Sequence, residues 1–133
     1  MFLSALNQEE KILFLEMAMN LAIANNVVDE TEVLMLDQYC KEMEITSFDK
    51  SQIHTVEEII DAFKGASETS KRIAVLELIG LSYSDGEFDK IEDSALRDFA
   101  TGIGLAEETY EQLSNDIDNY VSVANAIQEH VFH

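Results

Sequence analysis

Residues 81–105 read LSYSDGEFDKIEDSALRDFATGIGL and contain the end of an apolar helix, an acidic turn at Asp85-Gly86 and a second helix. The turn is predicted because Asp-Gly dipeptides favour chain reversal. Asp89 begins the second helix, since Asp89 with Glu92 three residues later is a typical pair at a helix N-terminus. The rest of the chain is organised around this helix–turn–helix unit.

The same plan occurs at residues 21–36, LAIANNVVDETEVLML, which align with the first unit without a gap at an offset of 60 residues. Two copies indicate a duplicated domain, because a solenoid would need a longer array of repeats. We therefore expect two tandem, pseudo-symmetric repeats, at about residues 8–64 and 67–130. The matching pairs are Leu21 with Leu81, Asp29 with Asp89, Glu32 with Glu92, Leu36 with Leu96, Met43 with Ile103, and Ile45 with Leu105.

The composition favours one all-α domain. A chain of 133 residues, 47% of them hydrophobic, is long enough to bury a core without disulfides or metals. There is no proline and there are only five glycines, so little interrupts a helical chain. No stretch shows the sustained alternation of a strand. The prediction is a single-domain helical bundle of about six to seven helices.

Helix boundaries follow from capping residues and apolar periodicity. The first helix is expected to begin after Asn7, which with Glu10 forms a capping box, and to end at Asn25-Asn26. Like the fourth helix, it is apolar nearly all round, which is typical of a central helix. The second helix is expected from Asp29, and the third carries apolar residues from Ile53 to Phe63 and ends at Lys64–Ser67, where Ser67 is a serine cap. The fourth carries apolar residues from Ile73 to Tyr83, the fifth runs from Asp89 to about Thr101, and the last begins near Ala106. The last has apolar residues at a period near three and a half and is expected to pack along one flank: Tyr110, Leu113, Ile117, Tyr120 or Val121, Ala124, Ile127 and Val131.

The sequence predicts a cytoplasmic protein. Its single cysteine, Cys40, forms no internal disulfide and is expected to be a small core residue. The N-terminus has no basic region before its apolar residues, so no signal peptide is predicted. No apolar run approaches the roughly 20 residues of a membrane span.

Charge is the most extreme feature of the composition. There are 27 acidic and 8 basic residues, a net charge of −19, and no lysine or arginine follows Arg97. Direct binding to nucleic acid needs a basic surface and is therefore not expected. Three interpretations remain: a cation site, a basic protein partner, or an acidic surface that only favours solubility.

The two acidic turns are the candidate metal site. If the halves pack about a pseudo-twofold axis, the oxygen ligands of both turns would converge, as calcium or magnesium requires. An EF-hand loop is excluded, because Leu81 stands five residues before Gly86, where that loop needs a carboxylate. The alternative is that these acids only cap helices. The candidate ligands are Asp85, Glu87, Asp89, Glu92, Asp29 and Glu32.

Other functional signals are weak. His54, His130 and His133 are scattered, without the spacing of a zinc site. Ser94, in Asp93-Ser94-Ala95-Leu96, loosely resembles the attachment serine of acyl carrier proteins, but Ala95 replaces the leucine of that site. No nucleophile–base pair or phosphate-binding glycine loop is present, so an enzyme is not predicted.

The doubled motif resembles the TerB-like family of tellurite-resistance operons, and also the related domain of some membrane-anchored J-domain co-chaperones. The resemblance is carried by Ser82–Glu92, SYSDGEFDKIE, and covers most of the chain. In the first copy, Asn25 and Asn26 replace the Asp-Gly of the turn. The resemblance implies a duplicated helical bundle whose acidic surface binds metal ions or partner proteins, and it implies no established enzymatic activity.

The leading hypothesis is therefore a non-enzymatic, acidic, TerB-like module that binds a protein partner, and a divalent cation at the acidic turns, in a stress or tellurite-resistance context. One alternative is an acidic decoy that occupies the basic groove of a nucleic-acid-binding protein. The other is an acyl-carrier-like domain that would use Ser94. The sequence leaves the oligomeric state open.

Overall fold

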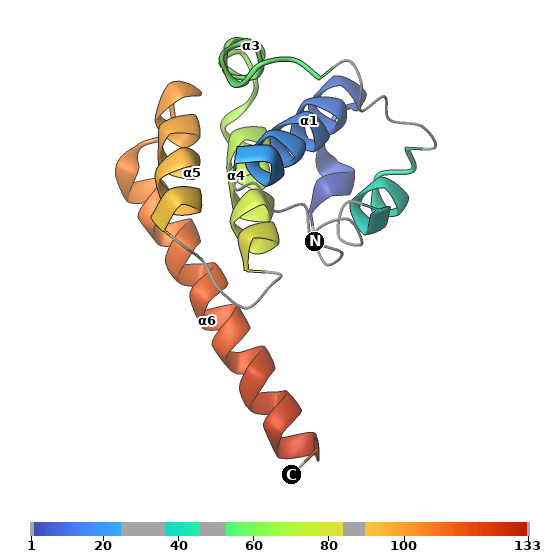
Figure 1. Cartoon of the computed structure of the whole chain (residues 1–133), viewed down its shortest axis with the longest axis vertical. Coiled ribbons are helices and arrows are strands. Elements are labelled where there is room, and N and C mark those ends of the chain that lie inside the picture. Colours follow the sequence, from blue (N-terminus) through green and yellow to red (C-terminus); the bar gives the residue numbers. More distant parts are fainter. Residues whose placement is uncertain (1, 25–36, 46–52, 84–89, 133) are drawn as a thin grey trace.

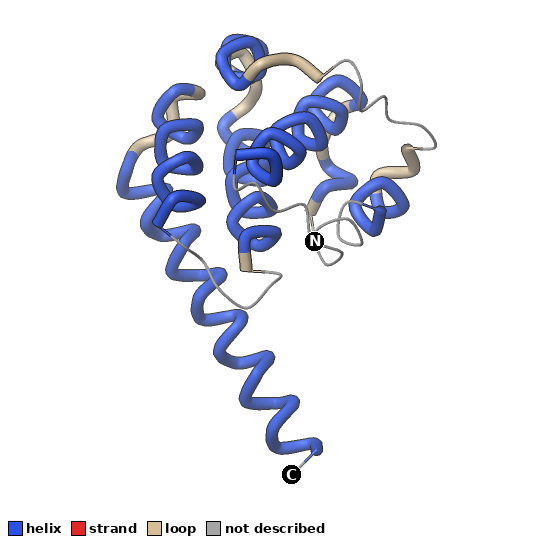
Figure 2. Tube along the Cα trace, viewed as in Figure 1, coloured by secondary structure: helices blue, strands red, loops and turns tan. Residues whose placement is uncertain are grey.

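The computed structural model describes residues 2–24, 37–45, 53–83 and 90–132, and every regular element in these ranges is helical (Figure 1, Figure 2). This confirms the all-α prediction for the described part of the chain. No helix in these ranges is long and apolar enough to cross a membrane. The elements are the 3-10 helix η1 (Leu3–Ala5), α1 (Gln8–Ala24), a helical segment at residues 37–42, α3 (Val56–Phe63), α4 (Glu68–Ser82), α5 (Lys90–Gly102) and α6 (Glu107–Phe132).

Side-chain caps fix the starts of three helices. The Glu10 N–H donates to Asn7 Oδ1 at 2.8 Å and the Asn7 N–H donates to Glu10 Oε1 at 2.9 Å, so the predicted capping box of α1 is confirmed. Ser67 caps α4, as its sequence position indicates. The third helix, by contrast, begins at Val56 and does not include Ile53, because Thr55 forms a capping box with Glu58 and ends the preceding extended segment.

The two nearly all-apolar helices, α1 and α4, lie at the centre, as predicted. Phe14 and Leu15 of α1 and Leu78 and Ile79 of α4 are all fully buried. Around them, α3 packs on α1, while α4 also contacts α5, α6 and η1. Cys40 is half-buried against this core, as expected of a small apolar residue.

The last helix packs along only part of its length. Tyr110 and Ile117 are buried against the body, but every described residue from 122 to 132 is exposed. Figure 1 shows the C-terminal half of α6 extending away from the other helices. The prediction that α6 packs along one flank is therefore wrong for this half, because nothing in the described chain lies beside its apolar residues.

Candidate functional site

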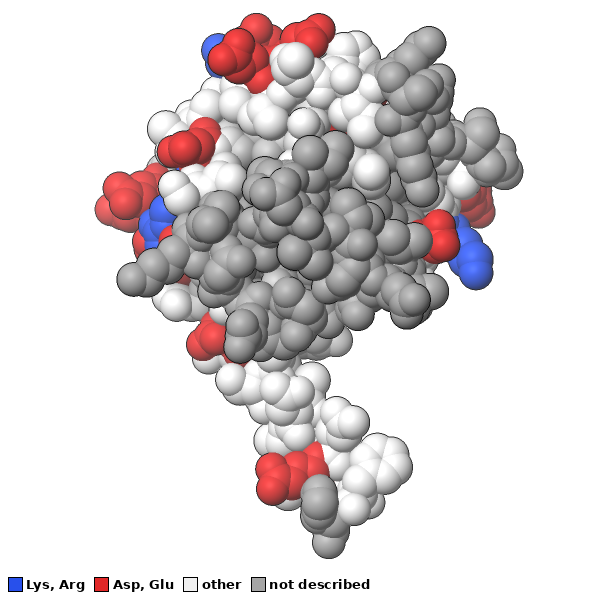
Figure 3. Space-filling view, in the orientation of Figure 1, with Lys and Arg blue, Asp and Glu red and all other residues white. Residues whose placement is uncertain are grey.

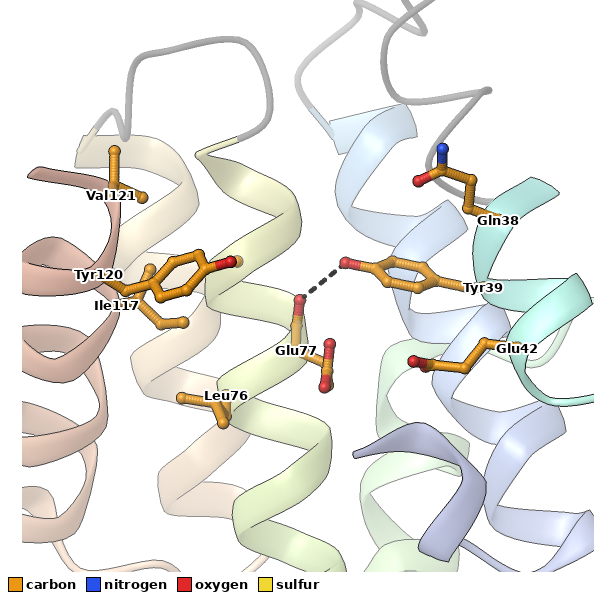
Figure 4. Close-up of a pocket in the computed structure, with 9 residues that line it drawn as sticks. Gln38, Tyr39, Glu42, Leu76, Glu77, Ile117, Tyr120 and Val121 are labelled. Atoms are coloured by element: carbon orange, nitrogen blue, oxygen red, sulfur yellow. Dashed lines mark hydrogen bonds between the residues drawn. The ribbon is translucent and has the colours of Figure 1, made fainter. Parts of the chain in front are cut away.

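A groove of about 360 Å³ lies above α4, and we call it the α4–α6 groove. Its floor comes from α4, one wall from residues 37–42 and the other wall from α6 (Figure 4). Apolar side chains and the bare backbone of Gly80 make much of the surface. The lining residues are Gln38, Tyr39, Glu42, Leu76, Glu77, Gly80, Ile117, Tyr120 and Val121.

Tyr39 and Glu77 hold the first wall of the groove to its floor. The Tyr39 hydroxyl donates to the backbone oxygen of Glu77 at 3.3 Å, and its ring packs edge-on against Phe14 with centroids 5.2 Å apart. The Glu77 carboxylate is 7% exposed and accepts the backbone N–H of Phe2 at 2.7 Å. The buried Tyr39 therefore anchors this wall to the floor, while Gln38 and Glu42 of the same wall are exposed.

The lining of the groove has a negative bias. Glu42 and Glu77 both contribute to it, and none of the nine lining residues is basic. Burial raises the pKa of Tyr39 well above its ordinary value, and the nearby carboxylates of Glu77 and Glu42 raise it further. A cationic group would be attracted into this groove, since field lines concentrate in a concave, low-dielectric surface.

A cluster around Arg97 fixes the packed half of α6 to α5. Arg97 Nε lies 2.8 Å from Asp93 Oδ2, another guanidinium nitrogen contacts the Glu111 carboxylate, and the guanidinium carbon lies 4.7 Å from the ring centroid of Tyr110. The Tyr110 hydroxyl donates to Asp93 Oδ1 at 2.8 Å. These hydrogen bonds raise the pKa of Arg97, and burial raises that of Tyr110. The partners satisfy one another, which is typical of a structural network.

A second polar cluster closes the opposite side of the bundle. Glu16 of α1 is only 4% exposed, and its Oε2 lies 2.7 Å from His54 Nδ1 and accepts the His54 backbone N–H at 2.9 Å. The Asn20 amide donates to the His54 backbone oxygen at 3.2 Å. The hydrogen bond to Glu16 raises the pKa of His54. His54 thus anchors the chain that leads into α3.

The predicted cation ligands lie almost entirely outside the described residues. Asp29, Glu32, Asp85, Glu87 and Asp89 are all outside them, and of the six only Glu92 belongs to a described helix, α5. Within residues 2–24, 37–45, 53–83 and 90–132, no three His, Cys, Asp or Glu side chains are grouped as a metal ion would need. The calcium or magnesium site therefore stays a prediction. The other candidate, Ser94, is an exposed residue in α5.

Comparisons with protein-family models, with curated proteins and with solved structures found no match to this chain. The TerB-like resemblance accordingly stays a prediction from the motif.

The sequence did not identify the α4–α6 groove, because its lining comes from three separated segments. One signal was present: Gly80 stands in the last turn of a helix that is apolar on nearly every side. A glycine inside a helix costs about 1 kcal/mol relative to alanine, so it often marks a close approach or an open surface.

Proposed function

We propose that this chain is a non-enzymatic, acidic helical module that binds a basic, partly apolar segment of a partner protein in the α4–α6 groove. The observation that carries the proposal is the groove itself, in which apolar side chains and a glycine lie beside Glu42 of one wall and Glu77 of the floor. The net charge of −19 adds long-range attraction for a basic partner and speeds its encounter. Acidic side chains also lie around the edges of the face seen in Figure 3.

The proposal includes the two tandem repeats and the TerB-like assignment. Asn7 and Ser67, which are 60 residues apart, each cap a central helix. Their neighbours Glu10 and Ser70 touch, since Ser70 Oγ donates to Glu10 Oε1 at 3.1 Å across the same separation of 60 residues. A direct contact between positions i and i+60 is what a local twofold axis between α1 and α4 would produce. These contacts support a duplicated bundle, the architecture that the resemblance implies.

The cation site of the acidic turns and the stress or tellurite-resistance context also belong to this proposal. They rest on the sequence motif alone. A titration of the amide NMR spectrum with calcium, magnesium and manganese, on wild type and Asp85→Asn, tests the site. Saturable shifts at residues 25–32 and 85–93 that the variant loses would support it, while diffuse shifts would leave these acids as helix caps.

The groove is tested with a synthetic peptide of alternating lysine and leucine blocks, with a glutamate/leucine peptide as the control. We expect the lysine peptide to shift the NMR signals of Tyr39, Leu76 and Tyr120, and its binding to weaken as salt is added. Glu42→Gln should weaken binding several-fold, whereas Glu108→Gln, which removes an exposed carboxylate on the first turn of α6, should not. Equal effects of the two variants, or binding of the glutamate peptide, would contradict the proposal.

A further inference from the structure

The C-terminal half of α6 carries an apolar stripe that nothing in the described chain covers. We define the α6 stripe as Tyr120, Ala124, Ile127 and Val131, which follow one another at spacings of four, three and four residues. Tyr120, Ile127 and Val131 are 58%, 57% and 68% exposed. The stripe continues the spacing of Tyr110, Leu113 and Ile117, which pack against the body. One seam thus runs along α6, covered in its first half and bare in its second.

The bare half needs a cover to remain helical. Residues 122–132 are all exposed and include the β-branched Val123, Ile127 and Val131, which lower helix propensity. Most helical stability in proteins comes from packing of an apolar face, and a segment of this length is marginal in water by itself. A packed partner would supply that stability.

The charges along the stripe indicate what this partner is. Residues 119–128 contain no charged side chain, although 26% of the whole chain is charged. Asp118 and Glu129 border this neutral stretch, and both lie on the side of the helix away from the stripe, given about 100° per residue. Between residues 119 and 128 a basic partner would find no carboxylate beside the stripe. A second copy of the same neutral surface would meet no like charge there.

We infer that two copies of this chain associate through antiparallel packing of their α6 stripes, with Tyr120 of each copy opposite Val131 of the other and Ala124 opposite Ile127. Spacings that alternate between three and four residues are those that let two helices interlock side chains along a shared seam. The pairing is isologous, so one surface serves both copies.

Electrostatics selects the antiparallel arrangement. A parallel pair would set two bodies of net charge −19 side by side. The antiparallel pair places them at opposite ends of residues 120–131, which span about 17 Å at 1.5 Å per residue. That separation is about twice the Debye length at physiological salt, so the repulsion is largely screened. Antiparallel helices also oppose their dipoles favourably.

The interface covers fewer than two heptads and falls in the class of small, weak interfaces. We therefore expect a dissociation constant in the micromolar range, about 1 μM to 1 mM. This inference does not rest on the proposed groove partner, although Tyr120 belongs to both surfaces, and the two associations respond oppositely to salt. Salt weakens the binding of a basic peptide, whereas it strengthens this dimer by screening the repulsion between the acidic bodies.

Sedimentation equilibrium of the full chain, from about 1 μM to about 1 mM, tests the inference. We expect a monomer–dimer equilibrium that shifts toward dimer with added potassium chloride. Ile127→Glu should lower the association constant at least about tenfold, because it buries a carboxylate in an apolar seam. The matched control is Ser122→Glu, which adds the same charge about 200° around the helix from Tyr120 and should leave the constant nearly unchanged.

Thermal unfolding of both variants should match that of the wild type at low concentration, since both sites are exposed in the monomer. A wild-type chain that stays monomeric at every concentration overturns the inference, whether or not its stripe binds phosphatidylcholine vesicles or the lysine peptide. Equal losses in Ile127→Glu and Ser122→Glu also overturn it.

The register of the two antiparallel α6 stripes can be tested separately, in a chain that carries Cys40→Ser. Mixing Tyr120→Cys with Val131→Cys should give a disulfide between the two variants under mild oxidation, because antiparallel pairing brings these positions within disulfide range. Neither variant alone should form a disulfide with itself. Self-linked Val131→Cys would indicate a parallel pair and overturn the arrangement.

Discussion

On one side of the bundle, α3 lies tightly against α1 and α5, whereas on the other side α6 and residues 37–42 leave a groove above α4. On the closed side, a Cβ placed on Gly102 would lie 3.0 Å from two carbons of Ile60, and the rings of Phe63 and Phe99 pack edge-to-face. Sixty residues from Ile60 and Gly102 stand Tyr120 and Glu42, which line the groove. Under the proposed duplication these positions would correspond, one pair in a closed interface and the other in an open groove.

The central helices differ in the same way. In α1, Glu16 and Asn20 hold the chain that precedes α3 through His54. In α4, the positions 60 residues later are Leu76 and Gly80, and both form the groove floor. The side chains of Leu76 and Gly80 cannot form such hydrogen bonds, and they leave space at the groove floor. A few side chains thus close the face between α1 and α3 and leave the face above α4 open.

The largest expected difference between the two faces concerns Phe63 and Tyr120. Phe63→Ala should cost about 3–5 kcal/mol of unfolding free energy, because the ring is 1% exposed and packs edge-to-face against Phe99. Tyr120→Ala should stay within about 0.5 kcal/mol, because its ring is 58% exposed. Urea unfolding of both variants at low micromolar concentration measures this, and similar costs would show that the groove wall is not open.

The next-largest expected difference in stability concerns Gly102 on the closed face and Gly80 at the groove floor. Gly102→Ala should cost about 1–2 kcal/mol, because the new methyl group lies too close to Ile60. Gly80→Ala should instead stabilise by about 0.5–1 kcal/mol, because alanine favours the helix and the nearest atom, Ile117 Cδ1, is 3.9 Å from the new Cβ.

Thermal unfolding combined with the peptide titration separates the two roles of Gly80. The more stable Gly80→Ala chain should bind the lysine peptide less tightly, since the methyl group narrows the groove floor. If Gly80→Ala is more stable and still binds the lysine peptide as tightly as the wild type, the peptide does not bind in the α4–α6 groove.

A smaller effect is expected where α6 joins the body. Tyr110→Phe removes the hydroxyl that donates to Asp93 and should cost about 1 kcal/mol. Hydrogen exchange of the α6 amides measures the consequence. Protection should fall first in the packed half of α6, while Tyr120→Phe, an exposed matched control, should leave it unchanged. Equal protection in the two variants would show that the Arg97 cluster does not hold α6.

The smallest effect is a pH dependence of the closed face. The hydrogen bond to Glu16 raises the pKa of His54, so the folded state holds the proton more tightly than the unfolded chain. The resulting stability is present below the unfolded histidine pKa of about 6.5 and is lost as the pH rises through the higher folded value. Urea midpoints measured on either side of this window should fall with rising pH in the wild type. The midpoints should fall less in His54→Gln. If the midpoint changes with pH by the same amount in the variant as in the wild type, other groups cause the pH dependence.

Features that depend on neighbours in the chain could be predicted from the sequence. The capping box of α1 and the serine cap of α4 were both predictable, because each is decided by side chains a few residues apart. The start of α3 was missed by three residues, since the spacing of Ile53 matched the helix but Thr55 forms the cap.

The candidate site was much less predictable. The sequence directed attention to the acidic turns, of which the described residues include only Glu92. It did not indicate the groove, whose walls come from residues 38–42 and 117–121 and whose floor comes from 76–80. Periodicity identifies the apolar side of a helix, but it carries no information on which other helix covers that side.

The sequence by itself determined the helical class, the central position of the two all-apolar helices and the seam along α6, because these follow from local capping and from how apolar residues repeat. Only the tertiary structure decided that Glu16 meets His54, that α3 closes one face while α6 leaves the other open, and that α6 leaves the body near Val121. Those outcomes depend on contacts between residues far apart in the chain. Their energies are set by shape and burial, which no single stretch of sequence encodes.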